Sequence, residues 1–244
     1  MTPRRFALIG GGKIGSAVVA AWQAGGLAGW DLASVLVRTQ APADWPWATT
    51  DTGRFFGSRP DVIVDCAGPQ ALTTHAERAL AVAEVWTVSA VALADAAFYG
   101  RVCEIASKSG HRMRVLAGAM AGLDGVAATA VDPHATLQLD IDLPPGPGEP
   151  ALVFSGSVRD AASRYPNHVN VAVAAALAGP GPDATQIRVH HPGPAAHFRL
   201  GLKAENVFGI LNVTVQLHVA PGVHPVAASI VAALRQQLQP VLVG

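Results

Sequence analysis

The sequence has no net charge, only two cysteines and no long uninterrupted apolar run. Lysine and arginine together number 17, as do aspartate and glutamate, so no overall field attracts nucleic acid or an anionic membrane. Cys66 and Cys103 have neither CxxC nor metal-ligand spacing and make no disulfide framework. We therefore expect buried free thiols and no bound metal.

No window contains the roughly 18 consecutive apolar residues that a membrane-spanning helix needs. The first five residues lead into an apolar strand without the apolar stretch and cleavage site of a signal peptide. These absences predict a cytoplasmic protein with no membrane or nucleic-acid partner. Half of the 244 residues are hydrophobic and only 14% are charged, which argues against disorder and predicts one large α/β domain or two modest ones.

Strand-like and helix-like segments alternate in the first half of the chain. The predicted strands are residues 6–9, 32–37, 61–66, 85–89 and 114–116, and predicted helices include 71–83 and 95–109. This alternation predicts an α/β fold with a doubly wound parallel sheet.

The pattern changes after residue 117. Apolar and polar residues then alternate in four stretches, which is typical of a sheet with one exposed face. These stretches are residues 135–143, 187–191, 197–204 and 210–218. Residues 226–238 return to helical periodicity and need a partner surface, in the first domain or a second subunit. We expect one domain over 1–117, with a C-terminal helix within 225–244 packing back on it, and a second α+β domain over 118–224.

The stretch GGGKIGSAV carries the main functional signal. Gly10, Gly12 and Gly15 fit G-x-G-x-x-G directly after a predicted strand and at a helix start. Gly10 allows the tight turn, Gly12 lets a pyrophosphate approach the backbone, and Gly15 lets helix and strand pack closely. The helix start, with Lys13 and Ile14, offers unpaired N–H groups to the phosphates. The alternative is a glycine-rich turn that binds no nucleotide.

The end of the second predicted strand indicates which dinucleotide is bound. An NAD-selective site usually has Asp or Glu there for the ribose 2′-hydroxyl, but this chain has Val37, Arg38 and Thr39. Arg38 is suited to a charge-assisted contact with a 2′-phosphate, although an exposed arginine is also commonplace. The pattern favours NADP over NAD. Ala67 and Gly68 follow the strand at 61–66 and bring backbone near the cofactor, or form an ordinary Gly-Pro turn.

Further segments occur in an order that resembles the L-aspartate dehydrogenase family over nearly the whole chain. After GGGKIGSAV they are DVIVDCAGPQAL, VSAVALAD, LAGAMAGLDGVAA, FSGSVRDAASRYPNHVNVAVAAALAG, AAHFRL and HPVAASIVAALR. The resemblance implies an N-terminal Rossmann domain, a second domain for catalysis and dimerisation, and a homodimer. It also implies NAD(P)-dependent interconversion of L-aspartate with iminosuccinate, which water converts to oxaloacetate and ammonia.

The resemblance assigns roles to residues of the second half. The family's catalytic histidine lies in an N-x-H-E-I strand, and the matching residue is His197, which would exchange a proton with the amine. An imidazole suits that role near physiological pH, although from the residues alone His197 is more simply an exposed strand histidine. Asn170 matches a retained asparagine and is assigned to the cofactor. Gly118 and Ala119, in the loop AGAMAGLD that resembles the family's, are assigned to the substrate. His168 is a candidate for a substrate carboxylate by its chemistry, or it could instead cap or pack.

Several positions depart from the family pattern. Asn167 stands at a lysine position and His168 at an asparagine position, whereas Ala195, Ala196 and Phe198 replace more polar residues around His197. The stretch APGVHPVAAS lacks the family's lysine and threonine and adds His224.

These departures leave alternatives open. Arg159 is a candidate for a substrate carboxylate, but a solvated helix charge is the simpler interpretation. A related NADP-dependent imine or carbonyl reductase with a changed substrate, and a dinucleotide-binding sensor without turnover, remain alternatives to an aspartate dehydrogenase.

Overall fold

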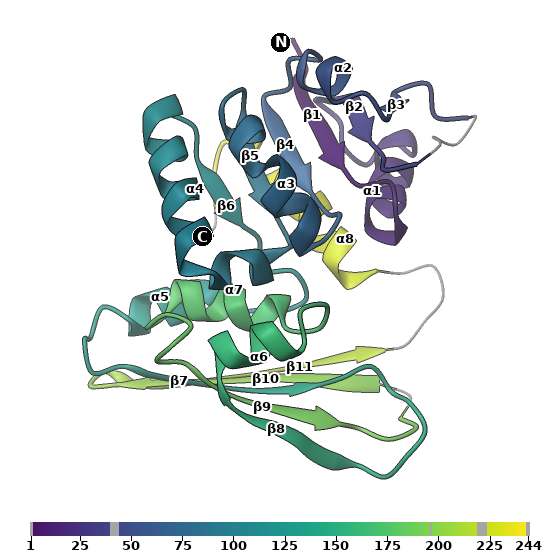
Figure 1. Ribbon diagram of the computed structural model, residues 1–244. Helices are drawn as coiled ribbons and strands as arrows, with labels where there is room; N and C mark the ends of the chain where they lie inside the picture. The colour runs from purple at the N-terminus through teal and green to yellow at the C-terminus, as the bar shows by residue number, and fades with distance from the viewer. Residues whose placement is uncertain (1, 40–43, 196, 219–223, 243–244) are drawn as a thin grey trace. The chain divides into compact units, whose positions relative to one another are not determined.

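A computed structural model describes residues 2–39, 44–195, 197–218 and 224–242. The chain divides into two compact units, each described by itself (Figure 1). Unit 1 comprises Met1–Ala92, Ala96–Gly118 and Gly222–Gly244, and unit 2 comprises Leu93–Asp95 and Ala119–Pro221. The division that we expect after residue 117 lies one residue before this one. No sequence pattern indicates that residues 93–95 belong to unit 2.

Unit 1 contains a six-stranded parallel sheet, which confirms the predicted parallel, doubly wound class, although only five of the strands were predicted. Its strands are β1 (Arg4–Ile9), β2 (Trp30–Leu36), β3 (Ala48–Thr49), β4 (Val62–Asp65), β5 (Glu84–Thr87) and β6 (Met113–Val115). Their order is β3-β2-β1-β4-β5-β6, the order of a Rossmann fold. All four residues of β4 are buried, because a parallel sheet is covered on both faces. Strand β3 was not predicted, since two residues show no period.

Helices cover both faces of this sheet. They are α1 (Lys13–Gln23), α2 (Thr52–Phe56), α3 (Pro69–Leu80), α4 (Ala96–Ser109) and α8 (Pro225–Gln236), with a 3-10 helix at Ala90–Ala94. Figure 1 shows α3 and α4 in front of the sheet and α8, in yellow, behind it.

The C-terminal helix α8 packs on unit 1, the arrangement expected for residues 225–244. Ile230 and Leu234 are fully buried in the same core as Phe6 and Val18. The Nε1 of Trp30 donates a hydrogen bond to the Leu234 carbonyl at 2.8 Å. The alanine and valine that require a partner surface therefore find it within their own chain.

The two cysteines differ in exposure. Cys66 is half-buried, and burial and the neighbouring Asp65 raise the pKa of its thiol. Cys103 is exposed on α4, so the prediction of buried thiols was wrong there. The reason is helical geometry: Val102 of the same helix faces the core, which turns the next side chain toward solvent.

Unit 2 contains a five-stranded sheet of mixed direction. The strands are β7 (Thr136–Asp142), β8 (Ala151–Ser157), β9 (Gln186–His191), β10 (His197–Asn206) and β11 (Gly209–His218), in the order β11-β10-β7-β9-β8. Only β7 and β9 pair in parallel. Four strands match the predicted alternating stretches. The fifth, β8, lacks a clean alternation of buried and exposed residues, which is why its sequence shows no period.

The helices of unit 2 lie on one side of its sheet (Figure 1). They are α5 (Leu123–Thr129), α6 (Val158–Arg164) and α7 (Asn170–Ala178). Leu139, Ile187 and Leu202 are buried on that side, whereas their neighbours Asp140 and Arg188 lie on the opposite side because strand side chains alternate. No helix of this unit, among the described residues, covers that second face.

Polar groups dominate the uncovered face of the sheet. The Nε of Arg188 lies 2.8 Å from the Oδ1 of Asp140, and the His190 Nε2 lies 3.1 Å from the same oxygen. These hydrogen bonds and the Arg188 charge hold the pKa of Asp140 below its usual range although burial raises it.

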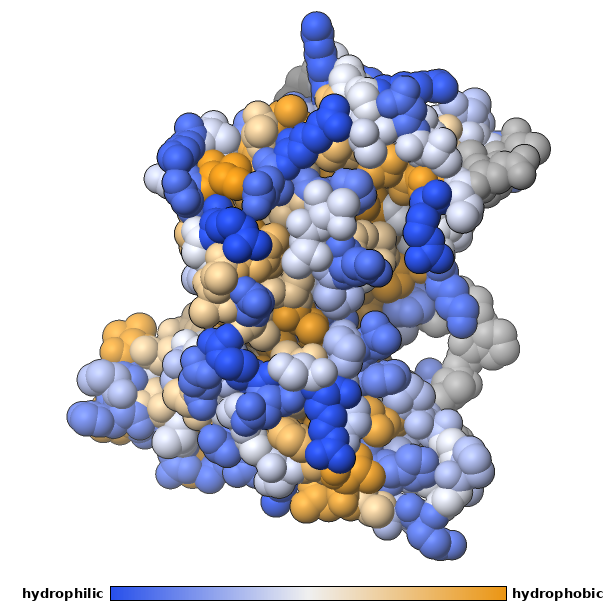
Figure 2. All heavy atoms as spheres, in the orientation of Figure 1, coloured by the Kyte–Doolittle hydropathy of each residue, from blue (hydrophilic) through white to orange (hydrophobic). Residues whose placement is uncertain are grey.

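In the view of Figure 2, hydrophobic residues form separate small patches between hydrophilic ones. Within the described chain, no helix combines the length and apolarity needed to cross a membrane.

Leu234→Ala tests how far α8 contributes to unit 1. We expect a loss of about 2–5 kcal/mol in the free energy of unfolding, because the deletion leaves a cavity in a fully buried site. Urea unfolding followed by tryptophan fluorescence measures it. Gln236→Ala, an exposed position on the same helix, serves as the control and should change stability by less than about 0.5 kcal/mol. Equal effects of the two substitutions would contradict the role of α8.

Candidate dinucleotide and substrate sites

The glycine loop connects β1 to α1, and each glycine of the motif meets a different constraint. Gly10 has a φ of +110°, and a Cβ there would lie 2.9 Å from the Cβ of Ala67. A Cβ at Gly15 would lie 2.0 Å from the carbonyl oxygen of Gly10. A Cβ at Gly12 meets nothing within 4 Å. Gly10 and Gly15 thus allow close backbone packing, whereas Gly12 leaves open space beside the loop.

A cavity of about 850 Å³ opens at the carboxyl ends of β1, β2 and β4. It is lined by Ile9, Gly10, Gly11, Gly12, Leu36, Val37, Arg38, Thr39, Thr50, Thr52, Cys66, Ala67, Gln70, Ala71, Thr74 and His75. Its place is where open parallel sheets bind ligands, and its volume suits a large organic ligand. The N–H groups of the first turn of α1 have no partner within the helix, and its N-cap, Gly12, has no capping side chain.

Four predicted cofactor residues line this cavity: Gly10, Gly12, Arg38 and Ala67. Arg38 is exposed at the end of β2, the position at which a ribose 2′-substituent is read in this fold. The backbone features therefore fit a dinucleotide: a glycine cradle for the pyrophosphate and an open helix N-terminus.

The other predicted residues of the loop lie beside the cavity. Ile14 packs against the core, and Gly15 is buried. Gly68 is the N-cap of α3, with a φ of +97°. Lys13 is exposed, and burial, together with the charge of Lys13, lowers the pKa of the His224 imidazole.

His197 is the first residue of β10 and is exposed. It pairs with His218 of β11 and lines a cavity of about 370 Å³ on the uncovered face of the sheet. The other lining residues are Asp142, Pro150, Ala151, His190, His191, Pro192, Ala195, Arg199 and Gln216. Imidazole and guanidinium groups thus gather around His197, although the sequence predicted no role for Arg199.

The remaining predicted site residues do not share the His197 cavity. Asn170 is the first residue of α7 in unit 2, and His168 is exposed in the turn before it. Gly118 follows β6 with a φ of +63°, and Ala119 comes next. Ala196 and residues 219–223, which include part of the altered APGVHPVAAS stretch, lie outside the described residues.

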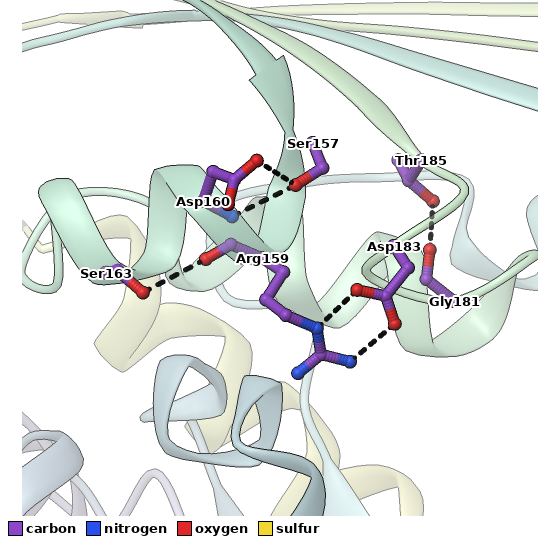
Figure 3. A network of polar contacts seen from close by, with 7 residues as sticks. All are labelled: Ser157, Arg159, Asp160, Ser163, Gly181, Asp183 and Thr185. Carbon is purple, nitrogen blue, oxygen red and sulfur yellow. Dashed lines mark hydrogen bonds and ion pairs between the residues drawn. The ribbon is translucent and has the colours of Figure 1, made fainter.

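Arg159 has a partner within its own unit. Figure 3 shows its guanidinium facing the carboxylate of Asp183 with two nitrogens, one of them 2.7 Å from Oδ2. This hydrogen bonding raises the pKa of Arg159 and lowers that of Asp183. Arg159 is therefore not the simple solvated helix charge that the sequence suggested, and its fork is occupied by an internal carboxylate rather than open to a substrate.

Sequence reasoning missed part of the wall of the larger cavity. Gln70, Ala71, Thr74 and His75 occupy one face of α3, and their spacing after Gly68 was a usable signal. Thr50 and Thr52 had no such signal in the sequence, because they follow the two-residue strand β3. Among the described side chains, no group of three or more His, Cys, Asp or Glu is arranged to hold a metal ion.

Two family models match the chain. Residues 10–116 match the NAD-binding domain of homoserine dehydrogenase, and residues 114–237 match the C-terminal domain of aspartate dehydrogenase. L-aspartate dehydrogenase of Ruegeria pomeroyi is 37% identical over 204 residues, covering 73% of this chain and 72% of the relative. The chain belongs to the L-aspartate dehydrogenase family. The predicted family and its class, the amino-acid dehydrogenases, are thereby confirmed.

Other relatives agree with this assignment. L-aspartate dehydrogenase 2 of Bordetella pertussis is 36% identical over 208 residues, covering 76% of this chain and 77% of the relative. The crystal structure of aspartate dehydrogenase from Thermotoga maritima has a TM-score of 0.80, covers 99% of both chains and is 20% identical. At that identity the likeness concerns the fold, and it confirms the predicted Rossmann-type unit with a second sheet-containing unit.

Substitutions in the glycine loop separate binding from folding. Gly12→Ala places a methyl group in open space beside the cavity, so we expect an unchanged melting temperature and at least about tenfold weaker dinucleotide binding, since backbone and pyrophosphate must approach closely. Gly15→Ala collides with the Gly10 carbonyl and should lower the melting temperature. Calorimetric titration and thermal unfolding measure the two effects. Unchanged binding by Gly12→Ala would contradict the cradle.

Proposed function

We propose that this chain is an NAD(P)-dependent L-aspartate dehydrogenase that interconverts L-aspartate with iminosuccinate. Water converts iminosuccinate to oxaloacetate and ammonia. The single observation that carries the proposal is the glycine cradle beside the larger cavity, in a chain whose second half matches the C-terminal domain of aspartate dehydrogenase. The dinucleotide, when bound, supplies or accepts the hydride.

The His197 cavity supports a substrate that carries carboxylates. In the proposed reaction, the imidazole of His197 takes the proton that the amine loses as hydride leaves Cα, and returns it in the opposite direction. Arg199 and His191 line the same cavity and offer hydrogen-bond donors of the kind that a four-carbon dicarboxylate needs at its two ends. They stand in for polar residues of the family that this chain lacks near Ala195.

A changed substrate is the second candidate function. Ala195 lines the cavity beside His197 at a position where the family is more polar. A smaller, less polar wall favours a less charged imine or carbonyl compound. NADPH remains the proposed cofactor in either case, because Arg38 lines the dinucleotide cavity at the end of β2. A homodimer stays a prediction.

The test is an absorbance assay at 340 nm with NADPH or NADH, oxaloacetate and ammonium. We expect oxidation of the cofactor that requires both oxaloacetate and ammonium. Oxidation only with a panel of ketones and imines supports the changed substrate, and binding without turnover supports a sensor.

His197→Ala should lower kcat at least about 100-fold and leave the dinucleotide Kd nearly unchanged. His134→Ala, also an exposed histidine of unit 2, should keep full activity; a matching loss there, or none at His197, argues against the catalytic assignment.

Arg38→Asp tests the cofactor preference. The substitution replaces a cation facing the 2′-phosphate with a carboxylate that repels it and suits a 2′-hydroxyl. We expect the ratio of kcat/KM for NADPH to that for NADH to fall at least about tenfold. Arg54→Asp, at an exposed arginine of α2, should leave that ratio unchanged. A ratio that does not move in Arg38→Asp would exclude the phosphate contact.

A further inference from the structure

A buried carboxylate lies directly beneath the wall of the dinucleotide cavity. Asp65 is the last residue of β4, has no exposed surface and is followed by Cys66 and Ala67, which line the cavity. Burying an ionisable group costs folding free energy unless polar partners compensate for the lost water. The partners of Asp65 therefore indicate what the residue contributes.

Three groups donate hydrogen bonds to this carboxylate. The hydroxyl of Thr87 lies 2.8 Å from Oδ2, and the backbone N–H of Ala67 lies 3.3 Å from Oδ1. The side chain of Ser89 is the third donor. Each of the two hydroxyls donates its only proton to Asp65, and its lone pairs can accept further hydrogen bonds.

The same hydroxyls accept hydrogen bonds from the backbone at and near the cavity wall. Ser89 Oγ accepts the N–H of Gly68 at 3.1 Å, and Thr87 Oγ1 accepts the N–H of Ser89 at 2.9 Å. Gly68 caps α3, the helix that carries Gln70, Thr74 and His75 along the cavity. In each of these paths a backbone N–H donates to a hydroxyl, and the hydroxyl donates to the carboxylate. The network therefore requires a hydrogen-bond acceptor at position 65.

We propose that Asp65 is a positioning residue for the dinucleotide, because its carboxylate holds the turn of residues 66–68 and the start of α3 in the shape that binds the cofactor. The inference rests on the proposed dinucleotide site. Asp65 acts through Ala67, Ser89 and Gly68 and does not itself line the cavity.

A proton on Asp65 disrupts the arrangement. Burial raises its pKa to about 6, while the bonds from Ser89, Thr87 and Ala67 act in the opposite direction. Above that pH the carboxylate accepts all three bonds. As the pH falls through 6, one oxygen becomes a donor that faces donors, and one bond is lost. Dinucleotide affinity therefore weakens as the pH falls below about 6.

Few other ionisable groups act on this network. Asp65 pairs with Ile9 of β1 and Thr87 of β5, and the groups that shift its pKa carry no charge. The thiol of Cys66, whose pKa burial raises, stays neutral. On α3, His75 lines the cavity, and burial and Arg78 lower its pKa. The experiment has to separate Asp65 from His75 and from the ligand.

Calorimetric titration of the full chain with NADH from pH 5 to 8 measures the effect. NADH is the probe because it lacks the 2′-phosphate, whose own pKa is near 6. We expect the wild-type Kd to rise roughly three- to tenfold below pH 6, the worth of one hydrogen bond. Asp65→Asn, which cannot ionise, should bind NADH at pH 8 as weakly as the wild type does below pH 6. Any remaining dependence of its Kd on pH should come from His75.

Thr87→Val keeps the shape of the side chain, but it removes one donor to the carboxylate and the acceptor of the Ser89 N–H. The pKa of Asp65 should rise further, so the midpoint of the pH profile should move upward from about 6, a shift that a merely structural role would not produce. Asp61→Asn, at the other end of β4 and exposed, should keep the wild-type profile. Near-UV circular dichroism confirms that each variant is folded, and Thr87→Val decides the question if Asp65→Asn does not fold.

The outcomes separate this inference from the proposed function. A wild-type Kd that is constant from pH 5 to 8, or an unshifted midpoint in Thr87→Val, overturns the role of Asp65 and leaves the dehydrogenase proposal intact. Failure of the wild type to bind either NADH or NADPH overturns both.

Discussion

The close approach of Gly15 to the carbonyl oxygen of Gly10 is the constraint on which the first unit depends. A Cβ at position 15 would lie 2.0 Å from that oxygen, so α1 can begin this near to β1 only without a side chain there. The approach directs the open N-terminus of α1 along the edge of the cavity. Gly10 in turn lies against Ala67, which brings the turn after β4 to the same place.

Polar groups hold the turn after β4, which also lines that cavity. Asp65, Thr87 and Ser89 form a buried chain of hydrogen bonds that ends on the amide of Gly68. Such a network specifies one arrangement more strictly than apolar contacts do, because each donor has a defined direction. Burial raises the pKa of Asp65 because it disfavours the ionised carboxylate, whereas the hydrogen bonds to the carboxylate favour that form.

The second unit divides its sheet between two tasks. Leu200 and Leu202 face the helices and are buried, so the period of two turns His197 and Arg199 toward the uncovered face. The histidine is thereby grouped with charged and polar neighbours from adjacent strands. In the proposed reaction, this group is the part of the chain that would contact the substrate.

Local patterns in the sequence were sufficient for the parallel, doubly wound class of unit 1, the glycine-rich turn before α1, the alternating strands of unit 2 and the C-terminal helix, because periodicity and turn chemistry act over a few residues. The tight turn at Gly10 and the close packing at Gly15 agree with the spacing of the motif. Short elements such as β3 and α2 escaped, and so did α7, which is apolar on every side and has buried residues at Ala172 through Ala176.

Only the tertiary structure decided which side chains meet. Arg159 contacts Asp183, 24 residues away, and Asp65 contacts Thr87 on the neighbouring strand β5 and Ser89 just after it. His197 and Arg199 join His190 of another strand in one cavity. The physical reason is that spacing along the chain determines the face on which a residue lies, whereas its partners on that face come from strand order, register and packing, which depend on distant residues at once.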